Sequence, residues 1–194
     1  MSGNESPEQL IKRIGKKPTL TSYAGKGFHG TSEVNAASIL QNGVDVARSR
    51  EGFYGKGFYF YEDNAPHPGV EAAANFLRTW RKSVDRIAVL VFEIAVSGNF
   101  LLDLVAIPEN RELFDRLQEE LINMAAHAGE IGKIDPRLIG TATAEFIVRY
   151  CPEARVVHAI RATFEMRNMT PGHQRGGCIR HAKCIAKPVQ IAVV

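Results

Sequence analysis

The stretch from Phe28 to Phe60 limits the folds open to this chain more than any other feature. It reads FHGTSEVNAASILQNGVDVARSREGFYGKGFYF. A His-Gly-Thr triplet ends a short apolar run, a helical segment follows, and the chain returns as a strand in which glycines separate aromatic residues. A hydrogen-bonding histidine and a tyrosine on neighbouring strands can line a slot for a flat ligand that carries ribose. We therefore expect ligand chemistry here rather than simple core packing.

The composition is that of one folded domain. The chain has 194 residues, 45% of them hydrophobic, which is enough to bury a core without disulfides or a metal. We expect one domain over residues 1–194, with a helical segment at 1–18 and a basic extension at 165–194. The formal charge of +3 and pI near 8.8 permit a phosphate-bearing partner but do not require one.

The compartment is also constrained by the sequence. Residues 1–18 mix acidic and basic side chains and lack the apolar stretch of a secretory signal, and the longest apolar runs are too short to cross a bilayer. Cys151, Cys178 and Cys184 cannot all pair with one another, which favours a reducing compartment. We expect a cytoplasmic protein with no membrane partner, and a protein delivered into a target cell without a general secretion signal would look the same.

Helix caps, β-branched runs and turn residues predict short strands with helices between them. The expected helices are 7–14, 33–41, 69–81 and 108–124. The expected strands are 19–23, 26–29, 55–61, 86–96, 144–150, 155–164 and 188–194. Residues 44–54 read as a polar loop. This pattern indicates an α+β fold with one mainly antiparallel sheet system.

Three groups of motifs resemble the catalytic domains of ADP-ribosyltransferases, in the His-Tyr-Glu branch that holds poly(ADP-ribose) polymerases and diphtheria toxin. The first group is HGT from His29, ASIL followed by a glycine at Gly43, and YGKGFYF from Tyr54. Residues 86–104, RIAVLVFEIAVSGNFLLDL, resemble the family's central hairpin, and EFIV from Glu145 resembles its catalytic strand. The resemblance implies two packed, mainly antiparallel sheets with flanking helices.

The resemblance also implies NAD+ as co-substrate and a catalytic set of Glu145, Tyr59 and His29. Cleavage of the nicotinamide glycosidic bond creates an oxocarbenium-like ribosyl cation, which a carboxylate stabilises. Glu145 would bind the nicotinamide ribose and stabilise that cation. Tyr59 would stack on nicotinamide, with a cation–π gain of about 0.5–2 kcal/mol, and His29 would donate to the adenosine ribose.

Further residues complete the implied NAD+ site. The backbone of Gly30 would hold the nicotinamide carboxamide, and Thr31 continues this close-approach turn. Phe76 would supply a second stacking ring, and Arg50 would lie over the diphosphate. The chain departs from the polymerase pattern at Ala73, which has no hydroxyl for the carboxamide.

Each of the main candidates also has an ordinary structural interpretation. Glu145 fits a solvent-facing glutamate on an edge strand, His29 a structural histidine at a strand end, and Arg50 a solvated basic loop. Most glutamates lie on the surface, and on that ground alone the solvent-facing interpretation of Glu145 would be favoured. The other motifs at suitable separations favour the catalytic role instead.

The resulting functional hypothesis is a mono-ADP-ribosyltransferase, a bacterial toxin or effector that modifies a macromolecule. A protein acceptor is favoured, RNA or DNA is the alternative, and an antitoxin or immunity protein is a possible partner. Arginine-modifying relatives have Glu or Gln two residues before the catalytic glutamate, whereas this chain has Thr143, so arginine is a less favoured acceptor. A non-catalytic module that binds NAD+ or RNA is the alternative from another class.

A second constellation lies near the C-terminus. His173, Cys178, His181 and Cys184 are zinc-ligand types, but their gaps match none of the common zinc spacings, and we expect no metal. The other interpretation is a basic surface loop that contacts a nucleic acid or an acidic acceptor. Its basic residues are Arg175, Arg180, Lys183 and Lys187.

Overall fold

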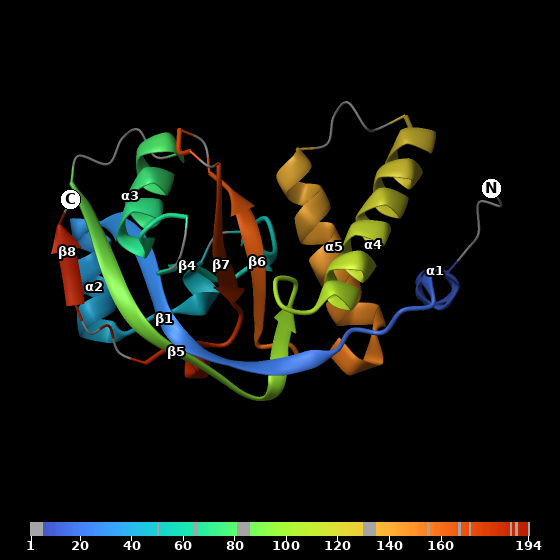
Figure 1. Cartoon of the computed structure of the whole chain (residues 1–194), viewed down its shortest axis with the longest axis horizontal. Coiled ribbons are helices and arrows are strands. Elements are labelled where there is room, and N and C mark those ends of the chain that lie inside the picture. The colour runs from blue at the N-terminus through green and yellow to red at the C-terminus, as the bar shows by residue number, and fades with distance from the viewer. Residues whose placement is uncertain are drawn as a thin grey trace.

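The computed structural model of the chain describes residues 6–49, 51–63, 66–80, 86–129, 135–154, 156–166, 168–170, 172–186, 188 and 190–193. Figure 1 shows a curved sheet with helices at both of its ends. The fold is α+β, as the sequence predicts.

One mixed sheet holds most of the strands. Its strands are β1 (Leu20–Ser32), β4 (Phe58–Glu62), β5 (Ile87–Asp103), β6 (Ala159–Glu165), β7 (His173–Ile179) and β8 (Gln190–Val193). They follow the order β1-β4-β7-β6-β5-β8, and β1 also pairs with β5, so the first five strands of that order close into a ring. We expected two packed sheets. The strands share one closed sheet instead, because the long strands β1 and β5 curve together along the base of the molecule (Figure 1).

Strand β1 is continuous where the sequence predicted two strands separated by Gly25. Every residue from Tyr23 to Ser32 has a partner on β5, ending with Ser32 opposite Ile87. The ring of Tyr23 lies where a side chain at position 25 would be, so only a glycine fits there. The Tyr23 hydroxyl is 2.6 Å from the position that a Cβ on residue 25 would take. The glycine therefore permits a close contact and does not end the strand.

Strand β5 is also longer than predicted, because residues 97–99 do not form the expected hairpin turn. Gly98 and Asn99 have φ angles of 69° and 57°, in the left-handed region that glycine and asparagine adopt most readily. Both halves of β5 nevertheless pair with the same strand, Leu102 opposite Leu20 and Ile87 opposite Ser32. The left-handed residues thus interrupt the regular strand without reversing it.

Five described helices flank the sheet: α1 (Pro7–Ile14), α2 (Glu33–Asn42), α3 (Gly69–Trp80), α4 (Pro108–His127) and α5 (Pro136–Tyr150). Helices α2 and α3 lie at one end, and α1, α4 and α5 lie at the other (Figure 1). All except α5 were predicted close to their observed bounds. None of the described helices combines the length and apolar character needed to cross a bilayer.

Helix α5 corrects the prediction of a strand at 144–150. Phe146 and the two aliphatic residues after it favour a strand locally. The buried positions are instead Gly140, Thr143, Ala144, Ile147 and Cys151, and the recurrence of burial every three or four residues places them on one face of a helix. Burial of that face overrides the local preference, and Glu145 therefore lies on a helix.

Strand β7 corrects the prediction of a basic surface loop for residues 173–179, whereas His181 and Lys183 beyond it are exposed outside the sheet. It pairs with β4 on one side and β6 on the other, so residues expected in an extension lie inside the main sheet. His173 is exposed and Cys178 is buried, as expected for residues an odd number of positions apart on a strand. The described residues contain no group of three or more side chains placed to hold a metal ion. Lys187 lies outside the described residues.

The two faces of the strands enter two apolar clusters. Phe58 and Phe60 of β4 lie in one buried cluster with Phe92 of β5. The neighbouring Tyr59 and Tyr61 face the other cluster, which contains residues of α3, α4 and α5. The alternation follows from the strand period of two.

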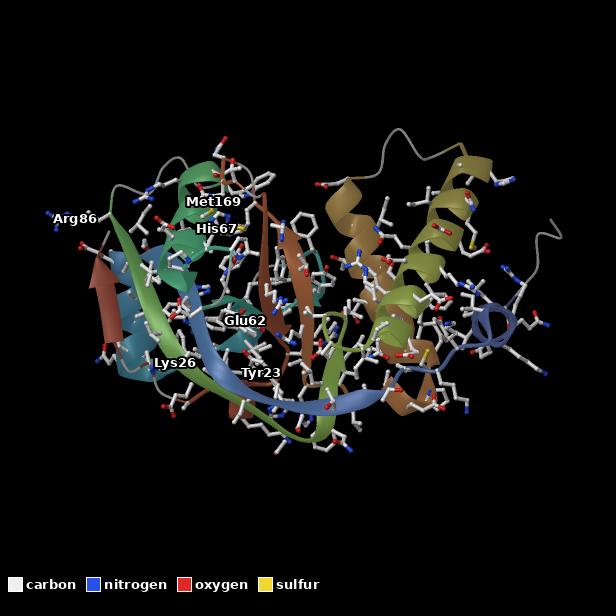
Figure 2. All side chains as sticks on the ribbon, viewed as in Figure 1. Tyr23, Lys26, Glu62, His67, Arg86 and Met169 are labelled. Carbon is white, nitrogen blue, oxygen red and sulfur yellow. The ribbon has the colours of Figure 1, made fainter. Side chains whose placement is uncertain are left out.

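A buried ionic network also joins the strands of the ring. Arg161 of β6 donates to Glu62 at 2.5 and 2.9 Å and to Asp103 at 3.1 Å, and the ring of Tyr23 lies 5.4 Å from its guanidinium carbon. Figure 2 labels Tyr23 and Glu62 of this network. Arg161 reaches β4 across β7 because its partner on β7 is Gly177, which has no side chain.

A short separate hairpin, β2 (Glu51–Gly52) with β3 (Gly55–Lys56), lies against α5. Three short 3-10 turns complete the described elements, at Val46–Arg48, Pro152–Ala154 and Ala182–Cys184.

Candidate functional site

Helix α5 places Glu145 over the β2–β3 hairpin. Thr141 and Glu145 are one helical turn apart and share a face. The Thr141 hydroxyl donates to the Gly52 carbonyl, and Glu145 Oε1 lies 2.6 Å from where a Cβ on Gly55 would be. Gly55 has a φ of 87°, which also disfavours any other residue there. The hairpin can approach the carboxylate this closely because residue 55 is a glycine.

Arg180 holds the Glu145 carboxylate from the other side. Its Nη2 lies 2.8 Å from Glu145 Oε1, and the side chains of Arg180 and Glu145 are 18% and 47% exposed. The Arg180 backbone N–H donates to the His158 carbonyl at 2.8 Å, which fixes the residue just beyond β7. Arg180 Nη1 is buried and has no hydrogen-bond partner among the described residues. The pair therefore leaves a buried donor without a partner among the described residues and about half of the Glu145 side chain exposed.

Tyr59 reaches the same glycine from β4. Its hydroxyl donates to the Gly55 carbonyl at 2.7 Å and accepts from the Tyr54 N–H at 2.9 Å. Burial raises the pKa of Tyr59, so the hydroxyl keeps its proton. The Tyr59 ring lies 2.6 Å from where a Cβ on Gly52 would be. The hairpin thus lies against the ring that was expected to stack on nicotinamide.

His29 lies where β1 and β4 separate. The two strands pair only at Gly27 and Phe28 of β1, and His29 Nδ1 lies 2.7 Å from the Tyr59 carbonyl oxygen. A carbonyl only accepts hydrogen bonds, so Nδ1 is the donor. The imidazole stacks on Phe58 at 4.2 Å between ring centroids. The His29 ring therefore lies on the Phe58 side of β4, whereas the Tyr59 ring points to the other side of that strand.

The other predicted NAD+-binding residues lie around α3. A side chain on Gly30 would collide with the Ala73 carbonyl, so this glycine permits close packing of α3 on β1. Thr31 is buried. Phe76 contacts the ring of Tyr61, at 6.2 Å between centroids, rather than that of Tyr59. Arg50 lies outside the described residues.

The structure thus brings Tyr59 and Glu145 together and adds Arg180, which the sequence assigned to a basic loop. No sequence pattern pairs Arg180 with Glu145, because their contact depends on α5 being a helix. Cys178 adjoins this cluster. Burial raises the pKa of its thiol to about 12, so the free thiol keeps its proton at neutral pH.

Comparisons with known proteins add one structural similarity. No family model and no curated protein matches the chain. Among solved structures, a chain of the M. tuberculosis MbcT–MbcA toxin–antitoxin complex is similar with a TM-score of 0.47 and 9% sequence identity. The similarity covers 95% of this chain and 91% of that chain. At that TM-score and identity it establishes neither a common fold nor a function.

Proposed function

We propose that the protein transfers ADP-ribose from NAD+ to a macromolecular acceptor and releases nicotinamide. The observation that carries the proposal is the convergence of Glu145, Arg180 and Tyr59 at Gly55. A half-exposed carboxylate held by an arginine is suited to stabilise a positive charge that develops in the transition state. The family resemblance of the sequence supplies the identity of the donor.

The proposed step breaks one bond and forms another. The bond between the anomeric carbon and the nicotinamide nitrogen breaks, and its electron pair leaves with nicotinamide. The ribosyl cation that forms lies beside Glu145, and an acceptor nucleophile attacks the anomeric carbon and then loses its proton. Catalysis in this scheme is mainly electrostatic, as in glycoside cleavage.

Two features of the residues present suit NAD+, and a third requires part of the protein to move before NAD+ can bind. The unpartnered Arg180 Nη1 suits one oxygen of the diphosphate, and the exposed part of the Glu145 carboxylate can accept from a ribose hydroxyl. Stacking of nicotinamide on Tyr59 requires displacement of the β2–β3 hairpin, because Gly52 lies against that ring. Ligand binding is therefore expected to move the hairpin.

The acceptor and the biological role belong to the same proposal. We favour mono-ADP-ribosylation of a protein by a toxin or effector, with RNA or DNA as the alternative acceptor and an antitoxin or immunity protein as a partner. The position of Thr143 gives no argument against an arginine acceptor. Thr143 is fully buried and its hydroxyl donates to the Ile139 carbonyl at 2.8 Å, so it cannot contact an acceptor.

The test is release of nicotinamide and transfer of label from adenylate-labelled NAD+, with and without cell lysate. The proposal predicts nicotinamide release and a labelled macromolecule. Digestion of that product by protease or by nuclease then identifies the acceptor class. Binding of NAD+ without any release, in the presence of lysate, would instead establish the non-catalytic module.

A further inference from the structure

Two adjoining cavities lie between α4 and the strands β6 and β7. Their volumes are about 400 and 290 Å³, near the range of about 300–1,000 Å³ in which small-ligand pockets fall. Both are lined by Arg111 and Thr163, so the two cavities adjoin at these residues. Neither is lined by His29, Tyr59 or Glu145.

The larger cavity is lined by basic side chains. His173 and Arg175 are two residues apart on β7, both exposed, and therefore point to one face. Thr163 lies directly opposite Arg175 on β6. Arg111 enters from α4, with its guanidinium oriented by a 2.8 Å bond from Nε to Asp115. No carboxylate is present among the described side chains that line this cavity, so its chemistry suits a phosphate.

The smaller cavity is lined by aromatic rings. Phe53 is 37% exposed at its rim. Tyr54 contacts Phe114 and Phe164 below, with ring centroids 5.6 and 5.5 Å apart. A nucleobase that stacks on aromatic side chains gains about 1–3 kcal/mol. The two cavities therefore offer a stacking surface next to a cluster of cations.

We infer that these cavities bind a phosphorylated nucleoside, with the base beside Phe53 and the phosphate beside Arg111 and Arg175. This ligand is additional to the NAD+ of the proposed reaction. A free nucleotide and the terminal nucleotide of a strand present the same chemistry. The site depends on residues 173–179 forming strand β7. Because side chains alternate between the two faces of a strand, Arg175 and His173 lie on one face, and Arg175 is opposite Thr163 of β6.

Calorimetric titration with AMP, adenosine and inorganic phosphate tests the inference. AMP should bind at least tenfold more tightly than adenosine or phosphate. Arg175→Ala should weaken AMP about tenfold, as expected for loss of a charged hydrogen bond. Phe53→Ala should weaken AMP and adenosine but not phosphate. Arg78→Ala, which removes an exposed arginine of α3, is the matched control and should change nothing.

Three results would overturn the inference. AMP binding no tighter than phosphate would leave only a surface that attracts anions. Equal AMP binding by Arg175→Ala and Arg78→Ala would remove Arg175 from the site. A parallel loss of NAD+ affinity in Arg175→Ala would mean that the cavities bind NAD+, the ADP-ribose donor of the proposed reaction. All three are binding measurements and are independent of turnover, and the first two involve no NAD+ and are therefore also independent of the proposed function. Comparison of AMP with a 5′-phosphorylated dinucleotide then tells the two sources apart.

Discussion

The carboxylate clusters around Arg161 and Arg180 differ in how completely their hydrogen bonds are satisfied. Arg161 uses three nitrogens on Glu62 and Asp103, and its two carboxylates have side chains only 5% exposed. Arg180 holds Glu145 through one nitrogen, keeps a second nitrogen unpartnered among the described residues, and leaves Glu145 half exposed. The Arg161 network is buried and its hydrogen bonds are satisfied, which is typical of a structural role. The Arg180 cluster has a donor that is unsatisfied within the described part of the chain and a half-exposed carboxylate, which is typical of a ligand-binding site.

The difference follows from where each arginine lies. Arg161 lies opposite Gly177 within the closed sheet and connects β4, β5 and β6, and its side chain is only 13% exposed. Arg180 follows the end of β7, where the sheet gives way to a helix and a two-stranded hairpin. The first cluster therefore holds the ring closed, and the second faces the β2–β3 hairpin, which the proposed binding of NAD+ would displace.

The largest expected effect is on stability at the saturated cluster. Arg161→Met should lower the free energy of unfolding by about 3–5 kcal/mol, because it removes the guanidinium that pairs with two buried carboxylates. Denaturant titration measures the change. The matched variant Arg161→Met with Glu62→Gln and Asp103→Asn should recover much of the loss. A loss below about 1 kcal/mol for the single change would mean that the network is not structural.

A smaller effect is expected where Tyr59 holds the hairpin. Tyr59→Phe removes the acceptor of the Tyr54 N–H and the donor to Gly55, and should cost about 1–3 kcal/mol of folding free energy. Tyr61→Phe is the control, because no hydrogen bond of the Tyr61 hydroxyl is present among the described residues. Equal melting temperatures for the two variants would show that the Tyr59 hydroxyl does not anchor the hairpin.

The smallest expected change in stability is at the unsaturated cluster. Arg180→Ala should cost about 1 kcal/mol or less, since its partner is half exposed, yet weaken NAD+ binding about tenfold. Arg180→Lys keeps the charge but loses the planar fork, and should recover only part of the affinity. Destabilisation of Arg180→Ala as large as that of Arg161→Met would remove the contrast between the clusters.

Local sequence signals predicted the elements whose stability is local. Helix α1 follows from its Ser6–Gln9 capping box, and α4 follows from its amphipathic repeat. Helix α5 was missed because Phe146, Ile147 and Val148 favour a strand and only the tertiary burial of Ala144 and Ile147 decides otherwise. The central place of β7 was missed because one of its two partners, β4, lies far away in the sequence, whereas the other, β6, directly precedes it.

The candidate site was predictable to a similar extent. Tyr59 and Glu145 were identified from motifs and do meet at Gly55. His29 was placed near Tyr59, but the side on which its ring lies depends on how β1 and β4 separate. Arg180 carries no local signal, since its role comes from a contact between the end of β7 and α5.

The most direct test of the account is nicotinamide release from NAD+ by the wild-type protein and by Glu145→Gln. Glutamine keeps the shape of the side chain but not its charge, so release should fall by about 10²–10³-fold with NAD+ affinity and melting temperature retained. Glu119→Gln, an exposed change on α4, should leave release unchanged. Undiminished release by Glu145→Gln would contradict the account and move catalysis away from the Glu145–Arg180 cluster.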